Sequence, residues 1–470
     1  MSSIGLGTTA TFLREEFYTI TFKDKRLKER FINIMDALSK KLTSCIRRAI
    51  INENDARQAY DFFQNEKVNY QEIFECHAKQ TAQRVKEYPD VVLLIQDGMR
   101  LNFTSHKAKT DIGRISKANG KDIYGIIQHS SLCVTENNEP LGLIDVQFFD
   151  YDQVDTSVSR FKRPIESKAN MCWIKAFENA QALIGTEKKV ITVADREGDF
   201  FEFLHVLTKK NADFVIRAKS NRNLEKDLNN EDDAQKINDT LQDAFAQASS
   251  FGTIKIEIQN VETRCVEEIP LHLKALTVTL PVPKKLNAYT EKQYNSITLN
   301  AVKACNENYE WTILTSLSIQ TLKDLEQIIS IYKARWHIED FHKVLKTGYQ
   351  VDEIFLHSCA DAIKTLLVMA IISALRLYWL IYKGRVSPEI RADELFTEFE
   401  WKSTYVYLKK PIPGMPPTLQ EVIFNIAMMG GFKNKENQQP PGIKTMWIGF
   451  SHMNVAARTL ENFVLMSTKT

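Results

Sequence analysis

Apolar residues recur along this chain with periods that change from one stretch to the next, and these changes predict its elements. Residues 11–85 follow a helical period. Continuous apolar runs, typical of buried strands, cover residues 91–95 and 189–194. Further strands are expected over 125–136, 141–149 and 214–218, with one helix over 167–186 and another ending near residue 210. The resulting order, strand-strand-strand-helix-strand-helix-strand, predicts a mixed α/β fold.

The second half of the chain begins with a β-rich stretch and continues as helices. Strand-like patches at 253–259, 271–281 and 296–304 interrupt the α/β order, and we interpret residues 221–310 as an insertion. Beyond this insertion the pattern is mainly helical, with a last amphipathic helix at about 443–466.

The most apolar stretch of the sequence, residues 362–382, is long enough to raise the question of a membrane span. Lys364 and Arg376 leave only 11 uncharged residues between them, which is too few to cross a bilayer. We therefore expect a buried core helix and no membrane association. The first residues have neither a basic start nor an apolar run, so we expect no signal peptide.

Residues 328–347 contain no Pro or Gly and are rich in helix formers, so they predict one continuous helix. At about 100° per residue, four polar side chains fall in a stripe about 60° wide, opposite an apolar face. The polar stripe consists of Tyr332, Arg335, Glu339 and Lys346. Two interpretations remain open: a solvated face with ion pairs, or a metal-binding carboxylate beside phosphate-binding cations.

Composition and charge exclude few classes of function. The 470 residues are 44% hydrophobic and 26% charged, with a net charge of +2, so a nucleic-acid surface has to be local. Residues 23–48 hold nine Lys or Arg against three acids, a balance that suits a DNA backbone but also a solvated amphipathic helix. The seven cysteines are scattered without a Cys-x-x-Cys pair, which favours reduced thiols over disulfides or a zinc ribbon.

Two acids follow predicted strands. Asp97 follows the run 91–95 and Asp195 follows 189–194, and ligands usually bind at the carboxyl ends of strands in an open α/β sheet. Each acid could instead cap a helix or face solvent. Together with Glu339 they could hold two Mg²⁺ ions, which activate water and stabilise a leaving oxygen in phosphodiester chemistry.

These three acids in this order resemble the ribonuclease-H-like DDE recombinases. More narrowly, Tyr-x2-Arg-x3-Glu-x6-Lys, met by the polar stripe, is similar to the signature of bacterial cut-and-paste transposases of the insertion-sequence-four family, which includes the Tn-five transposase. Residues 195–199, Asp-Arg-Glu-Gly-Asp, and 335–343 are similar to that family's second and third acid motifs. Gly98 follows Asp97 where the family commonly has Thr, yet Asp97 remains a better candidate than Asp90 or Asp111.

The resemblance implies a ribonuclease-H-like mixed sheet with flanking helices, a β-rich insertion, and helical terminal domains. The implied divisions are a helical DNA-binding domain at 1–75, a catalytic core at 76–220 and 311–375 around the insertion at 221–310, and a helical dimerisation domain at 376–470.

The resemblance also implies roles for individual residues. Asp97, Asp195 and Glu339 would be the catalytic metal ligands, for two Mg²⁺ ions with Mn²⁺ able to substitute. The residues implied to contact DNA phosphates are Tyr332, Arg335, Lys346 and Arg217, and those implied to bind the end sequence are Lys23, Lys25, Arg26, Lys28 and Arg30.

Two tryptophans are implied to handle a flipped base. Trp311 would stack on it and Trp336 would fill the vacated space, although Trp311 could equally be a core residue at a strand edge, and Arg217 an ordinary surface residue. His337 and His342 lack the spacing of a zinc helix, so we assign them no metal and expect core or surface roles.

The function implied is that of a DNA transposase acting as a homodimer on double-stranded DNA, both transposon ends and target, in the bacterial cytoplasm next to the nucleoid. Cleavage would pass through a hairpin intermediate before the 3′ ends join target DNA. Two alternatives remain: an inactive end-binding relative that inhibits transposition, and a stand-alone metal-dependent nuclease.

Overall fold

The N-terminal part of the chain is helical, as its periodicity predicts. The structure is a computed structural model, which describes residues 7–22, 24–105, 111–150, 163–225, 240–259, 266–284, 286, 294–354, 359–433 and 440–467. The first helices are α1 (Thr9–Glu16), α2 (Lys25–Lys41), α3 (Ile46–Ala49), α4 (Glu53–Phe63) and α5 (Tyr70–Glu87). Side chains at their starts explain where several begin: the Asp24 carboxylate, for example, accepts the Arg26 N–H.

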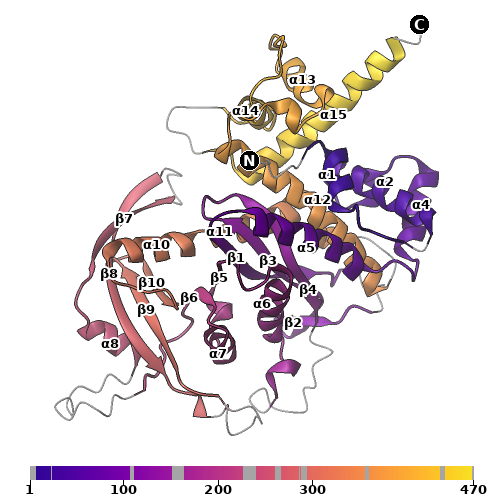
Figure 1. Ribbon diagram of the computed structural model, residues 1–470. Helices are drawn as coiled ribbons and strands as arrows, with labels where there is room; N and C mark the ends of the chain where they lie inside the picture. Colours follow the sequence, from indigo (N-terminus) through magenta and orange to yellow (C-terminus); the bar gives the residue numbers. More distant parts are fainter. Residues whose placement is uncertain are drawn as a thin grey trace, which may run out of the picture.

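Among the described residues the strands join into one ten-stranded mixed sheet in the order β2-β3-β1-β5-β6-β10-β9-β8-β7, with β4 beside β3 (Figure 1). The pairs β1–β5 and β5–β6 are parallel, and the other pairs are antiparallel. The strands are β1 (Val92–Asn102), β2 (Arg114–Ala118), β3 (Lys121–Thr135), β4 (Pro140–Phe149), β5 (Val190–Ala194), β6 (Asp213–Arg217), β7 (Gly252–Gln259), β8 (Val266–Leu280), β9 (Ile297–Cys305) and β10 (Glu310–Thr315).

Helices cover both faces of the sheet, which explains why its central strands read as continuous apolar runs. In Figure 1, α6 (Met171–Ile184) and α7 (Phe201–Lys209) lie on one side, and α10 (Leu322–Lys333) and α11 (Trp336–Lys343) lie on the other. The short α8 (Leu241–Gln247) packs against β8. Two large apolar clusters fill the layers, one with β1 and α10–α12 and the other with α6, α7, β6 and β9.

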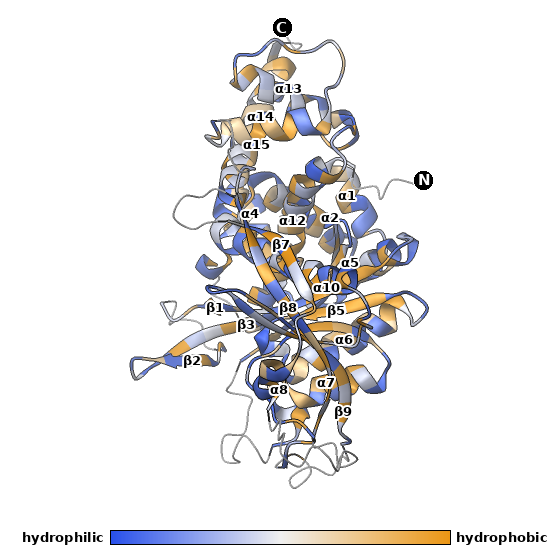
Figure 2. Cartoon of the chain, turned by 90° about the vertical axis from the view of Figure 1, so that its left-hand side faces the viewer, coloured by the Kyte–Doolittle hydropathy of each residue, from blue (hydrophilic) through white to orange (hydrophobic). Residues whose placement is uncertain are grey.

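One long helix, α12 (Ala360–Val386), connects the parts of the molecule. It packs against α2 and α5 on one side and α14 on the other, and the C-terminal helices lie together at one end in both views (Figure 2). Those helices are α13 (Glu398–Tyr407), α14 (Leu419–Met429) and α15 (Ile443–Ser467). Among the described residues α12 alone is long and apolar enough to cross a membrane, but its most apolar window is completely buried in the fold. The prediction of a core helix there is confirmed.

A buried ionic network ties α1 to α5 and to the sheet. The Glu16 carboxylate accepts hydrogen bonds from the Arg84 guanidinium at 2.9 and 3.1 Å and contacts His77 Nδ1. His77 Nε2 accepts the Leu143 N–H at 3.1 Å, which places the imidazole proton on Nδ1, facing Glu16. Burial by itself would raise the pKa of Glu16, but Arg84 and His77 together lower it to about 2.

The predicted fold class is confirmed, and the strand patches predicted within 221–310 correspond to β7, β8 and β9. Three elements of the sheet and its surroundings were not predicted: β2, α8 and β10. The strands of the predicted insertion are not separate from the core sheet, because β9 pairs along β10 and so extends it. The proposed domain divisions stay predictions.

Candidate functional site

Asp97 and Asp195 lie side by side on neighbouring strands. The parallel register of β1 and β5 ends with the pair Gln96 and Ala194, and each acid is the next residue. Neighbouring strands are about 4.8 Å apart, so the two acids lie next to each other where β5 ends. The prediction that Asp97 ends its strand is wrong, because β1 continues to Asn102 and pairs Asp97 with Ser130 of β3.

Asp195 has a local structural role as well. Its Oδ1 accepts the Glu197 N–H at 2.7 Å and caps a single 3₁₀ turn, Arg196–Gly198. A Cβ on Gly198 would stand 2.7 Å from the Ala194 Cβ, closer than packing allows, so the turn requires glycine here. The capping interpretation of Asp195 is therefore correct, and it fixes the carboxylate at the sheet edge beside Asp97.

Asp199, the last acid of the same motif, ties down a different loop. Its Oδ2 accepts the Lys219 N–H at 2.6 Å, and its Oδ1 accepts Arg222 Nε at 3.0 Å. The side chain is completely buried. Asp199 thus holds the segment that follows β6 against the end of β5, which brings Lys219 to the site.

The prediction of one continuous helix over 328–347 is wrong. Helix α10 ends at Lys333, Ala334 and Arg335 form a turn, and α11 begins at Trp336. A π-helical segment, Val344–Tyr349, follows α11. A single projection at 100° per residue therefore does not apply across the motif, and its four polar residues do not share one exposed stripe.

Burial separates the four residues of this motif. Tyr332 and Arg335 are 3% and 7% exposed, whereas Lys346 is exposed. The guanidinium of Arg335 lies 5.8 Å from the Tyr332 ring centroid, and its Nη2 donates to Glu339 Oε1 at 2.7 Å. The expected ion pair is present, but it is largely buried, so Arg335 positions Glu339 at the base of the site.

Electrostatics link the three acids. Burial, then the charge of Asp195 and, more weakly, that of Glu339 together raise the pKa of Asp97 to about 7, against the lowering effects of the Gly98 N–H and of Arg335. The charges of Asp195 and Glu339 therefore act on the Asp97 carboxyl group, which has little contact with solvent. Like charges gathered this way are typical of functional carboxylates.

The donor set suits a hard divalent cation, because all three side chains are carboxylates. As they lie, however, no three acidic, histidine or cysteine side chains in the described part of the chain are close enough together to hold an ion. The Glu339 carboxylate is instead paired with the Arg335 guanidinium at 2.7 Å.

A cleft of about 530 Å³ opens beside Asp97, between β1, β3, α6 and the π-helical segment. Its lining includes three cations, Arg100, Lys219 and Lys346, and two histidines, His129 and His342. Burial, followed by the neighbouring His342, lowers the pKa of His129 to about 3; burial, followed by Lys346, lowers that of His342 to about 3. The cleft is therefore cationic at its mouth and carries neutral imidazoles inside.

Of these cleft residues, only Lys346 was predicted as a site residue. His129, Arg100 and Lys219 were missed because their proximity depends on the pairing of β1 with β3 and on the Asp199 contact, neither of which leaves a local signal. His337 and His342, expected in core or surface positions, are both buried.

The two predicted base-handling tryptophans lie near Tyr332 and Arg335. Trp311 is half-buried on β10, with its ring edge-on to Tyr332 at 5.6 Å between centroids. Trp336 is 52% exposed, and Arg335 lies 5.2 Å from its ring centroid. Arg217 pairs with Ile313 across β6 and β10, and its Nη2 donates to the Glu310 carbonyl at 3.3 Å. Their roles with DNA stay predictions.

The basic residues predicted to bind end DNA lie at the start of α2, except Lys23, which is outside the described residues. Lys25, Arg26 and Lys28 are exposed, while Arg30 is half-buried. The apolar stripe of the same helix packs inward, so the cations face solvent. The amphipathic helix is therefore confirmed, and binding of end DNA by these cations stays a prediction.

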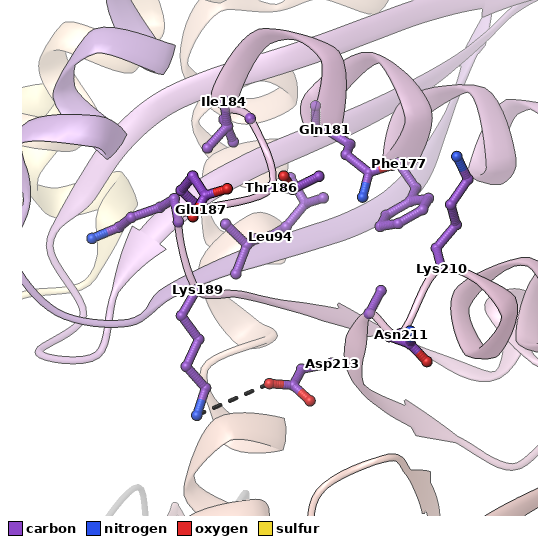
Figure 3. A pocket seen from close by; sticks show the side chains of 15 residues that line it. Leu94, Phe177, Gln181, Ile184, Thr186, Glu187, Lys189, Lys210, Asn211 and Asp213 are labelled. Atoms are coloured by element: carbon purple, nitrogen blue, oxygen red, sulfur yellow. Dashed lines mark ion pairs between the residues drawn. The ribbon is translucent and has the colours of Figure 1, made fainter.

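A second cleft, of about 310 Å³, lies at the opposite end of β5 (Figure 3). It surrounds the start of β5 and β6, where Lys189 and Asp213 are 4.0 Å apart. Because Asp97 and Asp195 lie near the other end of β5, this cleft is not part of the carboxylate site.

Three family models match the chain. The transposase DNA-binding model matches residues 9–68, the transposase DDE domain model matches 174–375, and the model for the transposase Tn5 dimerisation domain matches 372–462. The DDE match includes Asp195 and Glu339 and begins after Asp97. A DDE domain has a ribonuclease-H-like fold, and it supports DNA cleavage and strand transfer with divalent metals in general terms.

Proposed function

We propose that this chain, which has the DNA-binding, DDE and dimerisation domains of a DNA transposase, is a cut-and-paste enzyme of the insertion-sequence-four type. It cleaves its ends through a hairpin intermediate and joins the 3′ ends to target DNA. The observation that carries the proposal is that Asp97 and Asp195 lie side by side, each one residue past the last β1–β5 pair, with the charge of Glu339 acting on Asp97. Neighbouring carboxylates oppose each other's ionisation unless a cation binds beside them.

The proposed cofactor is a pair of Mg²⁺ ions, for which Mn²⁺ can substitute; when bound, they activate the attacking oxygen and stabilise the leaving one. The chain's part is to supply and orient the ligands. Asp97 and Asp195 present carboxylates from adjacent parallel strands, with Asp195 held by the Glu197 N–H. Glu339 completes the set from α11 when it leaves the Arg335 guanidinium.

Arg335 then becomes free to bind a DNA phosphate, which replaces the carboxylate as its partner. Lys346, exposed at the cleft, and Arg217, on β6, are the other phosphate contacts in this proposal, and the Tyr332 hydroxyl donates a hydrogen bond. Trp311 supports a flipped base from the Tyr332 side, while the exposed Trp336 fills the vacated stack.

The ends of the chain supply DNA capture and assembly. The exposed cations of α2 bind the transposon end, and α15 supports a homodimer on DNA. Apolar side chains along the end of α15 are open to solvent, with Phe463 69% and Met466 74% exposed. The proposed location is the bacterial cytoplasm, in contact with the nucleoid.

The test is incubation of the full chain with Mg²⁺ and linear DNA that carries the terminal repeats flanking its own coding sequence. We expect a nick, then a hairpin, which under denaturing conditions runs as one covalent strand about twice as long as the strand of the cleaved end. Binding with no cleavage would favour an inactive end-binding inhibitor. Nicking with no hairpin or joined product would favour a metal-dependent nuclease.

Glu339→Ala serves as the matched variant in this assay. It should abolish cleavage and leave end binding largely intact, because the carboxylate acts on the reaction and not on duplex capture. Glu326→Ala, at an exposed position on α10, should cleave like the unmodified chain. Retained cleavage in Glu339→Ala would remove Glu339 from the site.

A further inference from the structure

His342 lies three residues after Glu339 on α11, so the two side chains share the face that packs against β1. Its Nδ1 is 3.9 Å from Asp97 Oδ2, and the two side chains are only 10% and 15% exposed. This separation is about 1 Å longer than a hydrogen bond and too short for a bridging water. A small rotation of either side chain would close it.

No described residue forms a hydrogen bond with the other ring nitrogen of His342. Its Nε2 is buried and has no hydrogen-bond partner among the described residues, and the same holds for both nitrogens of His129 behind it. A buried polar atom without a partner costs about 1–3 kcal/mol. An apolar side chain would fill this position at lower cost, so packing does not explain a histidine here.

His337, on the same helix, differs from His342 because both of its ring nitrogens have hydrogen-bond partners. Its Nδ1 is 2.9 Å from the Tyr378 hydroxyl, and its Nε2 is 3.0 Å from Asn138 Oδ1. Both nitrogens are used within the fold, so its role is structural. His342 differs in that the polar group nearest its Nδ1 is a proposed metal ligand.

The Asp97 carboxylate can accept a hydrogen bond from His342 and still bind a cation. Its Oδ1 accepts the Gly98 N–H at 2.8 Å, and Oδ2 faces His342. Each carboxylate oxygen has two lone pairs, so one hydrogen bond on each still leaves positions for a cation. Carboxylates that bind metals are usually oriented by such outer hydrogen bonds.

We propose that His342 is a positioning residue for Asp97: its Nδ1–H donates to Asp97 Oδ2 and fixes the direction in which the carboxylate meets divalent ions. The donor is available in the Nδ1–H tautomer without any change of charge. This inference rests on the proposed function, in which Asp97 is a metal ligand. Metal-binding measurements on matched variants distinguish failure of the positioning role from failure of the proposed function.

The test compares His342→Asn with His342→Gln in the full chain. The Asn amide nitrogen can occupy the place of Nδ1, whereas the Gln amide nitrogen reaches the place of Nε2. Mn²⁺ binding is measured from the electron paramagnetic resonance signal of the free ion, with no DNA and no reaction. We expect His342→Gln to weaken Mn²⁺ binding about 10-fold or more, and His342→Asn to stay within about threefold of the unmodified chain.

Two control variants separate the outcomes. Asp97→Asn should lose Mn²⁺ binding at this site; unchanged binding there would contradict the proposed function itself. His337→Asn should lower the melting temperature and leave Mn²⁺ affinity unchanged.

The positioning role is overturned if Asp97→Asn loses the ion but His342→Gln binds it normally. It is also overturned if His342→Asn binds Mn²⁺ as weakly as His342→Gln does. Should His342→Gln not fold, His342→Phe, which keeps a ring and removes both nitrogens, takes its place with the same prediction.

Discussion

Asp97 and Asp195 occupy equivalent positions on two parallel strands, one residue beyond the last pair in the β1–β5 register. The carboxylate of Asp97 is 15% exposed, and its pKa is raised to about 7. Two acids placed this way favour a bound cation but oppose each other without one. The site therefore lowers the stability of the ion-free protein.

Asp97→Asn should make the ion-free protein more stable at pH 8. In the folded chain Asp97 keeps its proton up to about pH 7, against an ordinary value of 3.8, so stability falls as pH rises through this window. The gain should be on the order of 1–3 kcal/mol at pH 8 and small at pH 4. Thermal unfolding with a chelator present measures it, and an equal gain at both pH values would show that ionisation of Asp97 is not the cause.

The Glu16 network predicts acid sensitivity of the opposite sign. The folded pKa of Glu16 is about 2 against an ordinary 4.5, so its contribution is present above about pH 4.5 and is lost as pH falls toward 2. Glu16→Gln leaves the largely buried Arg84 guanidinium without its charged partner and should cost about 3–5 kcal/mol at pH 7.

The difference in melting temperature between Glu16→Gln and the unmodified chain should narrow between pH 5 and pH 3. Glu15→Gln, at the exposed neighbouring position, is the control and should melt like the unmodified chain at every pH. A difference that stays constant across this range would show that the charge of Glu16 is not what stabilises the network.

Much of the fold follows from the sequence because the signals are local. The apolar runs before Asp97 and Asp195 predict their strands, but only the pairing of β1 with β5 brings the two acids together. The extension of β1 to Asn102 was missed although it has a local signal, because apolar Met99 and Leu101 alternate with polar Arg100 and Asn102.

The break at Ala334 and Arg335 marks the limit of local propensity. The stretch has no Pro or Gly, and a straight helix is its expected local conformation. The turn instead buries Arg335 between the Tyr332 ring and the Glu339 carboxylate, an arrangement that depends on the sheet below. The cleft histidines were missed for the same reason, since only the register of β1 and β3 places His129 opposite Gly98.

Trp311→Ala should bind end DNA normally but lose hairpin formation at least about tenfold, because one base stacked on an aromatic ring gains about 1–3 kcal/mol. Trp311→Phe keeps part of this surface and should lose less. The fluorescence of 2-aminopurine placed at the DNA end reports base extrusion directly. Normal hairpin formation in Trp311→Ala would show that Trp311 serves only to pack against Tyr332.

The C-terminal helices depend on a close glycine contact. A Cβ at Gly449 on α15 would stand 1.9 Å from the Ile426 carbonyl oxygen on α14. Gly449→Ala should therefore separate α14 from α15, cost about 1–3 kcal/mol and weaken dimer formation on DNA. Gly442→Ala, where a Cβ meets no atom within 4 Å, is the control. Light scattering of the DNA complexes reads out the dimer, and equal behaviour of the two variants would rule out the contact as its support.

The proposed chemistry depends most on whether Asp97, Asp195 and Glu339 share one cation site. Replacing the ion with Fe²⁺ and adding ascorbate produces radicals that cut the backbone next to bound iron, and mass spectrometry locates the cuts. We predict cuts near residues 97, 195 and 339 together, all suppressed by excess Mg²⁺ and lost in Asp97→Asn. Cuts at one of these positions without the other two, or cuts that Mg²⁺ does not suppress, would contradict the shared site.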